Sequence, residues 1–502
     1  MARQQPVFQR THLRRIVPFP LLFLLVITGC SPYSVRSLEQ PTVTIPQAYH
    51  HGATGERVLG QWWREFGDLR LNAAMESVFT ENFELRQTWS RLAQAQALAR
   101  IEGAEQVPQV DFRTGASRLH TVDREAMDLH GNRLRRTANP DRYFVATGLT
   151  YEIDIWKRIA ARRTAAQLES VASRQDVEAT ALLLTGAVVN AWLTCQEQYA
   201  LLDVLREQIQ VSQTLLNLTE LRFSVGTGSA VNVLQQRQQL ADTQAQVPVV
   251  QSFLETALNQ LAVLLGRVPG SLDELAPGRS LPELPSFPQL VSPAMLLVSR
   301  PDLQAAQLRL QSADYRVAAA VAERLPRLVL QLSYEFSARS WDTFFRQEIG
   351  SLIGDIITPL VDGGRRRNEV VRQKARVQEL LDRFGQTYLT ALREIEDALV
   401  QERQQRELIR NLERQITLAQ STLDVSRSRY THGLIDYLNV LVAVQSLQAL
   451  QRRVISERKT LLSRRAELYR ALGGKWTETL EAPNAIRLAA SSDPAVLPGG
   501  RL

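Results

Sequence analysis

The chain has 502 residues, of which 44% are hydrophobic and 22% are charged, and these proportions exclude disorder throughout. The formal net charge is +7, but four arginines lie in the first 15 residues. The other charges are interspersed rather than gathered into a basic stripe, so no nucleic-acid partner is expected.

Residues 1–30 have the layout of a secretory signal: a basic start, an apolar stretch over residues 16–27, and then Ile27-Thr28-Gly29-Cys30. These last four residues resemble a bacterial lipobox, in which the cleaved chain begins at an acylated cysteine. We therefore predict a lipoprotein signal peptide over 1–29 and lipid attachment at Cys30. Ser31 follows where many lipoproteins kept at the inner membrane have Asp, which favours the outer membrane. The alternative is an ordinary signal with a cysteine there by chance.

Apart from residues 16–27, the sequence is not expected to form a membrane-spanning helix, which needs roughly 18 to 20 apolar residues. Any membrane crossing is therefore expected to use strands. The second cysteine, Cys195, lies in an apolar stretch and is interpreted as a core residue.

The chain contains an internal duplication. At one constant offset, Arg222-Phe223 matches Arg429-Tyr430, Gly226 matches Gly433, and Leu265-Gly266 matches Leu472-Gly473. The predicted organisation has an N-terminal segment over 30–80, a first repeat over 81–265, a Pro-rich segment over 266–300, a second repeat over 301–474 and a C-terminal tail over 475–502.

Each repeat is expected to begin with a helix, to continue with a β-hairpin (107–155 and 326–361) and to end with a long helical hairpin. In the strands, apolar and polar residues alternate, most clearly from Tyr143 to Ile155 and from Leu328 to Ser337. The fourth strand, within 347–360, is predicted more from its position than from its pattern. A polar loop from Thr121 to Asp141 is expected inside the first β-hairpin. A soluble sheet covered by helices is the alternative to a membrane sheet.

In the helical hairpins, apolar residues recur at alternating steps of three and four, as in heptad seams. The turns are predicted near 226–229 and near 432–436. Four strands cannot close a barrel, and unpaired strand edges are costly in lipid, so the missing strands must come from identical copies.

Several motifs, taken together and in this order, resemble the TolC family of outer-membrane efflux channels, and within it the OprM-like or NodT-like lipoproteins of resistance-nodulation-division pumps. The motifs are Trp62-Trp63-Arg64-Glu65-Phe66, Tyr151-Glu152-Ile153-Asp154-Ile155-Trp156-Lys157-Arg158, Arg300-Pro301-Asp302-Leu303, Pro359-Leu360-Val361-Asp362-Gly363-Gly364-Arg365, and Arg429-Tyr430 with Gly433, Tyr437 and Leu438.

The resemblance implies a mixed fold, in which long α-helical hairpins form a periplasmic α-barrel and four antiparallel strands contribute to a trimeric, twelve-stranded transmembrane β-barrel. By the same analogy, the Pro-rich segment and the C-terminal tail form an equatorial girdle. The implied partners are two further copies, a periplasmic adaptor, an inner-membrane resistance-nodulation-division transporter and outer-membrane lipid.

The resemblance also places the helical turns at a periplasmic tip that holds a gate. The implied tip and gate residues are Gly226, Gly433, Arg429, Tyr430, Asp436 and Tyr437. Relatives often have Asp where this chain has Val442, so a carboxylate ring at that height is expected to be missing. A purely structural role of Arg429, Tyr430 and Tyr437 in the turn is the alternative.

The predicted function is an outer-membrane channel that passively conducts small molecules, such as drugs or toxic compounds, from a pump to the exterior. No catalytic residues, metal site or cofactor are expected, apart from the acyl lipid at Cys30, because no nucleotide, zinc or nucleophile motif occurs. One alternative is the outer-membrane component of a type I protein or peptide secretion system. The other is a periplasmic coiled-coil adaptor or scaffold lipoprotein.

Overall fold

The computed structural model describes residues 32–36, 43–51, 60–127, 133–138, 141–272 and 275–483. The predicted signal peptide and Cys30 lie outside these described residues. The chain divides into two units, each of which is described by itself. Unit 1 comprises residues 1–36, 101–164 and 314–374, and unit 2 comprises residues 37–100, 165–313 and 375–502.

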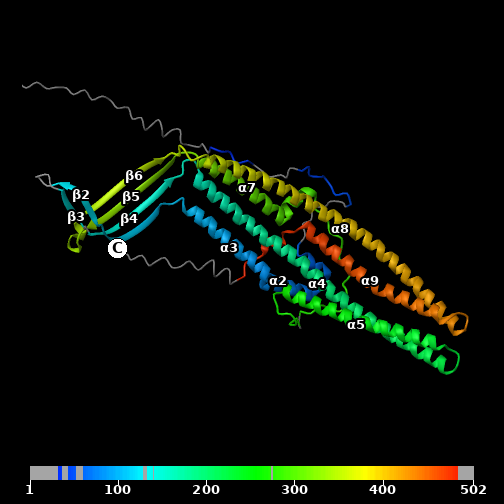
Figure 1. Cartoon of the computed structure of the whole chain (residues 1–502). Helices are drawn as coiled ribbons and strands as arrows, with labels where there is room; N and C mark the ends of the chain where they lie inside the picture. Colours follow the sequence, from blue (N-terminus) through cyan, green and yellow to red (C-terminus); the bar gives the residue numbers. More distant parts are fainter. Residues whose placement is uncertain are drawn as a thin grey trace, which may run out of the picture. The chain divides into compact units, whose positions relative to one another are not determined.

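Unit 1 is built on a four-stranded antiparallel sheet in the order β1-β4-β5-β6 (Figure 1). The strands are β1 (Gln109–Arg118), β4 (Asp141–Ile153), β5 (Arg327–Ala338) and β6 (Glu348–Ile357). The prediction of four antiparallel strands, including the poorly patterned fourth, is confirmed. The hairpins β1–β4 and β5–β6 come one from each repeat, and β4 and β5 join them at the centre of the sheet.

The prediction of a polar loop from Thr121 to Asp141 is wrong. This segment contains a two-stranded sheet of β2 (Thr121–Met127) and β3 (Arg133–Ala138). Both strands carry charged residues in place of a consistently apolar face, so hydrophobic alternation could not reveal them.

The helices follow the predicted order. They are α2 (Leu69–Glu81), α3 (Phe83–Ala104), α4 (Arg158–Ser224), α5 (Ala230–Leu264), α6 (Leu296–Ser299), α7 (Pro301–Ala322), α8 (Arg365–Thr431) and α9 (Tyr437–Leu472), with short 3-10 turns η1 (Trp62–Phe66), η2 (Pro293–Met295), η3 (Trp341–Arg346) and η4 (Lys475–Thr479). In unit 2 the hairpins α4–α5 and α8–α9 lie side by side (Figure 1). The prediction of paired long helical hairpins is therefore confirmed.

One expectation about α4 needs correction. This helix contains an 18-residue stretch that is apolar enough to span a membrane, and 61% of that stretch is buried within the protein. The burial identifies the stretch as a core segment of a long helix, which passes the same test of length and composition as a membrane span.

The largest apolar cluster of unit 2 joins the segment around Trp62 to the segment that follows α9. Trp62 stacks on Tyr469 of α9 at 5.6 Å between ring centroids, and Trp63 meets Trp476 of η4 edge-on at 4.8 Å. All three tryptophans are buried, together with Phe66 and the apolar face of α2. Aromatic rings bury large areas, so this cluster holds the segment before α2 and the segment after α9 to the helices.

A buried ion pair fastens the Pro-rich segment to the long helices of unit 2. Arg465 of α9 is 0% exposed and Glu402 of α8 is 3% exposed, and two nitrogens of Arg465 donate to the carboxylate at 2.6 and 2.9 Å. A third nitrogen of Arg465 donates to the carbonyl oxygen of Pro285, and the guanidinium lies 5.1 Å from the centre of the Phe287 ring. The arginine thus meets acceptors from two segments that are far apart in sequence.

The internal duplication is visible in the packing after α5 and α9. Gly266 and Gly473 both have positive φ, of 73° and 75°. A Cβ on Gly266 would lie 2.5 Å from the carbonyl oxygen of Glu81, and a Cβ on Gly473 would lie 2.4 Å from that of Ser299. Both glycines therefore meet the backbone just before the first helix of their own repeat, where no side chain fits.

Replacing Gly473 by alanine is expected to destabilise the protein by about 1–3 kcal/mol, through backbone strain and the clash with Ser299. The matched control is Gly433→Ala, because Gly433 has a similar φ of 74° but open space around its Cβ position. The midpoint of thermal unfolding in detergent should fall further for Gly473→Ala than for Gly433→Ala. Equal shifts would show that the Ser299 contact contributes nothing.

Candidate functional site

The sheet of unit 1 has one apolar face, which the strand register assembles from all four strands. Leu332 of β5 pairs with Leu149 of β4 and Leu352 of β6, and Leu149 pairs in turn with Val110 of β1. The same face carries Phe112, Thr114, Tyr143, Val145, Thr147, Tyr151, Ile153, Leu328, Leu330, Tyr334, Phe336 and Ile356. Because side chains alternate between faces, this register places most of the large apolar strand residues on one surface, whereas Phe144, Val329, Ile349, Ile353 and Ile357 lie on the other.

The opposite face of the sheet is mostly polar. Arg142 of β4 forms an ion pair with Glu335 of β5, and Gln331 donates to Asp355 of β6 at 3.3 Å. The hydroxyl groups of Ser333 and Ser351 lie 2.7 Å apart. These contacts satisfy polar groups across neighbouring strands, as expected for a face that meets water.

The two outer strands, β1 and β6, each pair with a neighbour on one side only in the described part of the chain. Aromatic residues gather near one end of the sheet, where Tyr143 lies 4.8 Å from Trp341 and Phe336 lies 5.6 Å from Phe345, measured between ring centroids. At the other end, Trp156 donates its indole N–H to the carbonyl oxygen of Pro326 at 2.8 Å. The sheet is therefore two-faced, about as long as a bilayer core is thick, and open at both edges.

The two helical turns of unit 2 are built alike. After α4, Gly226 has a φ of 77°, and after α8, Gly433 has a φ of 74°. In each turn the glycine N–H and the next N–H bond back to the last turn of the helix, which is the hydrogen-bond pattern of a glycine C-cap. The bonds run from Gly226 N to Phe223 O (3.1 Å), Thr227 N to Arg222 O (2.9 Å), Gly433 N to Tyr430 O (3.0 Å) and Leu434 N to Arg429 O (2.9 Å).

The two tyrosines of the second turn make their contacts with residues of the same chain. Tyr430 and Tyr437 are buried, and their rings meet at 5.4 Å between centroids. The hydroxyl of Tyr437 donates to Gln236 of α5, and the guanidinium of Arg222 lies 4.6 Å from the centre of the Tyr430 ring. Burial raises the pKa of Tyr437, so this hydroxyl stays a hydrogen-bond donor at physiological pH.

Arg429 and Asp436, by contrast, are exposed, and in the described residues neither forms an ion pair. Val442 is 55% exposed on the first turns of α9. The structure thus brings Tyr430 and Tyr437 together against the first hairpin and leaves Arg429, Asp436 and Val442 free to face other molecules.

A layer of buried side-chain amides, within the first helical hairpin and between it and α9, was not predicted from the sequence. The Gln236 amide donates to the Ser212 carbonyl at 2.8 Å, the Gln239 amide to Gln448 at 3.1 Å, and the Gln208 amide to the Gln448 carbonyl at 3.1 Å. Ser212 interrupts the heptad seam of α4 and was the one available signal. Because buried amides must be paired, this layer fixes how α4, α5 and α9 sit against one another.

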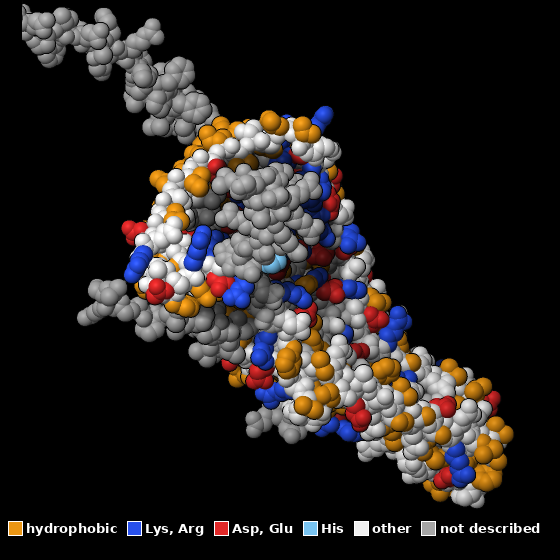
Figure 2. All heavy atoms as spheres, turned by 60° about the vertical axis from the view of Figure 1, so that its left-hand side comes forward, with side chains coloured by type: hydrophobic (Ala, Val, Ile, Leu, Met, Phe, Trp, Pro, Cys, Tyr) orange, Lys and Arg blue, Asp and Glu red, His pale blue; other side chains and the backbone are white. Residues whose placement is uncertain are grey.

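Exposed hydrophobic side chains are frequent on the parts of the hairpins near the turns. In Figure 2 they are the orange side chains gathered at the lower end of the helical unit. They include Leu221, Phe223, Val225, Val231, Leu234, Leu418, Val425, Leu434, Leu438 and Val442. So many exposed large apolar residues on two neighbouring hairpins are typical of a surface that another chain covers.

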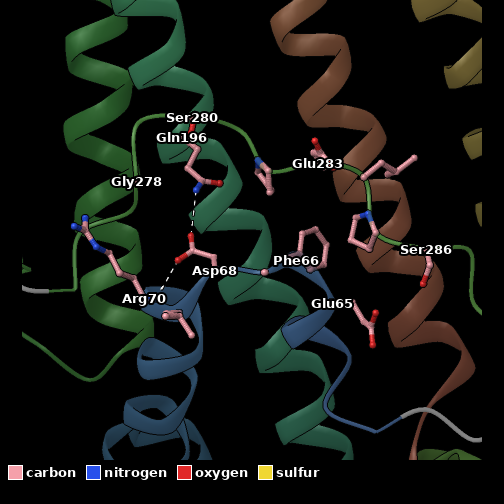
Figure 3. Close-up of a pocket in the computed structure, with 14 residues that line it drawn as sticks. Glu65, Phe66, Asp68, Arg70, Gln196, Gly278, Ser280, Glu283 and Ser286 are labelled. Atoms are coloured by element: carbon pink, nitrogen blue, oxygen red, sulfur yellow. Dashed lines mark hydrogen bonds between the residues drawn. The ribbon is translucent and has the colours of Figure 1, made fainter.

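A cleft of about 780 Å³ in unit 2 lies beside the start of α2. Figure 3 shows Asp68 and Gln196 next to each other on its wall. Asp68 accepts from Gln196 at 3.3 Å, from the indole N–H of Trp192 at 2.9 Å and from the backbone N–H of Arg70 at 2.9 Å. These bonds give Asp68 a structural role, as the N-cap of α2 and its tie to α4.

Metal or thiol chemistry finds no support in the described residues. No group of three His, Cys, Asp or Glu residues is placed there to hold a metal ion. Burial raises the pKa of the Cys195 thiol to about 12, so the reactive thiolate does not form at neutral pH.

Comparison with known proteins gives a consistent result. Residues 75–267 and 293–474 match the family described as outer membrane efflux protein. The pyoverdine export outer membrane protein OpmQ of Pseudomonas aeruginosa is 30% identical over 428 residues, which are 83% of this chain and 87% of that protein. The toluene efflux pump outer membrane protein TtgI of Pseudomonas putida is 26% identical over 477 residues, which are 91% of this chain and 98% of that protein.

Two solved structures extend the likeness to the fold. The outer-membrane channel OprN has a TM-score of 0.79 and 25% identity, and the match covers 90% of this chain and 100% of that one. The outer membrane protein VceC of Vibrio cholerae has a TM-score of 0.76 and 26% identity, and the match covers 84% of this chain and 100% of that one.

Proposed function

Because the chain belongs to the outer membrane efflux protein family, whose members are the outer-membrane components of efflux systems, we propose that three copies of it close one channel around a common axis. The observation that supports this proposal is the sheet of unit 1, which has one apolar face, one mostly polar face and two open edges. An open edge in lipid leaves backbone groups unpaired at several kcal/mol each, so each edge requires another strand. Four strands from each of three copies give a closed barrel with the apolar face toward lipid and the polar face toward a water-filled lumen.

We propose that the chain is anchored by acyl groups on Cys30. The first described residue is Pro32, and the next residue, Tyr33, donates its hydroxyl to Asp314 of α7 at 2.6 Å within unit 1. Cys30 precedes Tyr33 by three residues, which reach at most about 11 Å, so this docking keeps Cys30 near the unit that carries the membrane sheet. Metabolic labelling with palmitate should mark the wild type and fail to mark Cys30→Ala; equal labelling would contradict the anchor.

The conducted solutes are proposed to be small molecules delivered by a periplasmic adaptor and an inner-membrane transporter. Relatives are named for pyoverdine export and toluene efflux, which supports small-molecule efflux over protein secretion. The duplicated hairpin and the membrane sheet leave no support for an adaptor or scaffold. Nothing in the described residues supplies energy, so conduction is passive and the transporter provides the driving force.

We further propose that the helical turns carry the gate, closed by contacts between copies and held in shape by contacts within each copy. The exposed Arg429 and Asp436 are suited to the first kind of contact, and the buried pair Tyr430 and Tyr437 serves the second. With Val442 in place of a carboxylate, hydrophobic contact contributes to the constriction at that height.

The gate is tested by Tyr437→Phe, which leaves the side-chain amide oxygen of Gln236 buried without this donor at a cost of about 1–3 kcal/mol. In planar bilayers the purified wild type should give discrete conductance steps with short open times, and Tyr437→Phe should open more often. Tyr430→Phe is the matched control, because no hydrogen bond of its hydroxyl is seen among the described residues. Absence of conductance from the wild type would contradict the channel, and identical gating of the two variants would contradict the role of Tyr437.

A further inference from the structure

The end of the sheet at which β4 and β6 finish, called the rim, has an unusual backbone feature. Lys157 has a φ of 57° and is the one non-glycine residue with positive φ in the described chain. It directly precedes α4, just as Gly364, with a φ of 81°, directly precedes α8 in the second repeat. The left-handed conformation costs a residue with a Cβ roughly 1–2 kcal/mol and costs glycine nothing. The chain therefore keeps a lysine where its own duplicate has the easier residue.

Lys157 belongs to a group of cations at this rim of the sheet. Ile153, Leu328 and Ile356 lie in register near the ends of their strands, so the residues just beyond them share one rim of the sheet. Figure 1 shows α4 and α8 beginning at this rim. The cations at this rim are Arg327, which is the first residue of β5, and, just beyond the strands, Lys157, Arg158, Arg324, Arg365, Arg366 and Arg367.

Two of these cations are neutralised within unit 1. Arg158 bonds to Glu152 at 2.9 Å, and Arg366 bonds to Asp362 at 3.1 Å. Their arginine neighbours further along α4 are also paired, Arg162 with Glu323 and Arg163 with Gln106. Lys157, Arg324, Arg365 and Arg367 are exposed, and no ion pair or side-chain hydrogen bond is seen for them among the described residues. Four exposed cations of the rim are therefore without an ion-pair partner in the described part of the chain.

Exposed apolar residues accompany this charge. Leu360 is 89% exposed and Val361 is 94% exposed, directly between the end of β6 and the arginines of α8. Apolar side chains beside free cations suit the boundary between acyl chains and headgroups, where the carbon atoms enter lipid and the charges meet phosphate.

We propose that Lys157, Arg324, Arg365 and Arg367 bind the phosphate groups of anionic phospholipids in the periplasmic leaflet. This inference rests on the proposed function, which places the sheet in a membrane. It adds a lipid selectivity that apolar burial alone does not provide, since only charge distinguishes anionic from zwitterionic headgroups. The backbone strain at Lys157 is offset by this contact when lipid is bound.

The test uses delipidated protein in neutral detergent, with increasing phosphatidylglycerol or phosphatidylcholine, and follows the temperature at which the assembled oligomer dissociates. The wild type should be stabilised at lower concentrations of phosphatidylglycerol. Each rim cation removed should raise the half-maximal concentration about fivefold, in Lys157→Gly, Arg365→Gln and Arg367→Gln singly and combined. Lys157→Gly should in addition be more heat-resistant than the wild type without lipid, which a merely structural lysine does not explain.

The matched control removes three exposed cations of unit 2, Arg206→Gln, Arg237→Gln and Arg410→Gln, for the same change in net charge. The proposal is overturned if the combined rim variant keeps the wild-type preference, if the control loses it equally, or if inorganic phosphate at the same concentration stabilises as well as phosphatidylglycerol. Conductance in a neutral bilayer, measured in parallel, reports separately on the proposed function, because the rim cations are not expected to alter it.

Discussion

Replacing Arg465 by methionine is expected to lower the free energy of unfolding by about 3 kcal/mol, because the buried carboxylate of Glu402 then keeps only its contact with the half-exposed Arg406. The same change removes the donor to the carbonyl oxygen of Pro285, which releases the Pro-rich segment from α9. Unfolding midpoints in detergent, followed by tryptophan fluorescence, measure the effect.

The control is the neighbouring Arg464→Met, which breaks a half-exposed pair with Glu467 and should cost at most about 1 kcal/mol. Adding Glu402→Gln to Arg465→Met should restore part of the loss, since the carboxylate that has lost its buried cation is then replaced by a neutral amide. If Arg465→Met proves no more harmful than Arg464→Met, the buried pair does not hold the segment.

Replacing Leu352 by arginine is expected to abolish insertion of the sheet into a membrane. Leu352 is exposed on the apolar face near the middle of β6, and an arginine facing lipid at the bilayer midplane costs about 2–4 kcal/mol in each copy. Three such charges in one barrel cost about 6–12 kcal/mol, which is comparable with the whole stability of a typical protein domain.

The matched control is the next residue, Ile353→Arg, which loses a comparable apolar side chain from the polar face. The yield of heat-resistant oligomer in outer-membrane fractions should fall sharply for Leu352→Arg and remain near the wild-type level for Ile353→Arg. The opposite order of yields would mean that the assignment of the two faces is reversed.

Those parts of the fold could be predicted in which the buried residues recur in the sequence at the period of a helix or a strand. The seams that place Leu202, Leu205 and Leu216 in the core of α4 follow the heptad pattern, and the alternation over 143–155 follows the two faces of β4. Gly226 and Gly433 were predictable because a reversal between antiparallel helices needs a left-handed residue. In these places one physical constraint dominates, and it leaves a pattern in a single segment.

The features that escaped prediction depend on contacts between distant segments. Gln236 and Gln448 look like solvent-facing residues in the sequence, and only the packing of two hairpins buries them. The paired burial of Arg465 and Glu402 likewise has no local signal. Tyr430 and Tyr437 were predicted near a gate, but sequence could not tell a contact within one chain from a contact between chains.

The central claim is that the open edges β1 and β6 of one copy pair with those of its neighbours, and inter-chain disulfide formation tests it most directly. Asp111→Cys in β1 is combined in turn with Ile349→Cys, Ser351→Cys and Ile353→Cys in β6, all on the polar face. Cys195 is buried and gives no background. After oxidation in native membranes, at least one pair should yield covalent products of two and three chains and none larger. Cross-links confined to single chains, or an open-ended ladder of larger products, would contradict a channel closed by three copies.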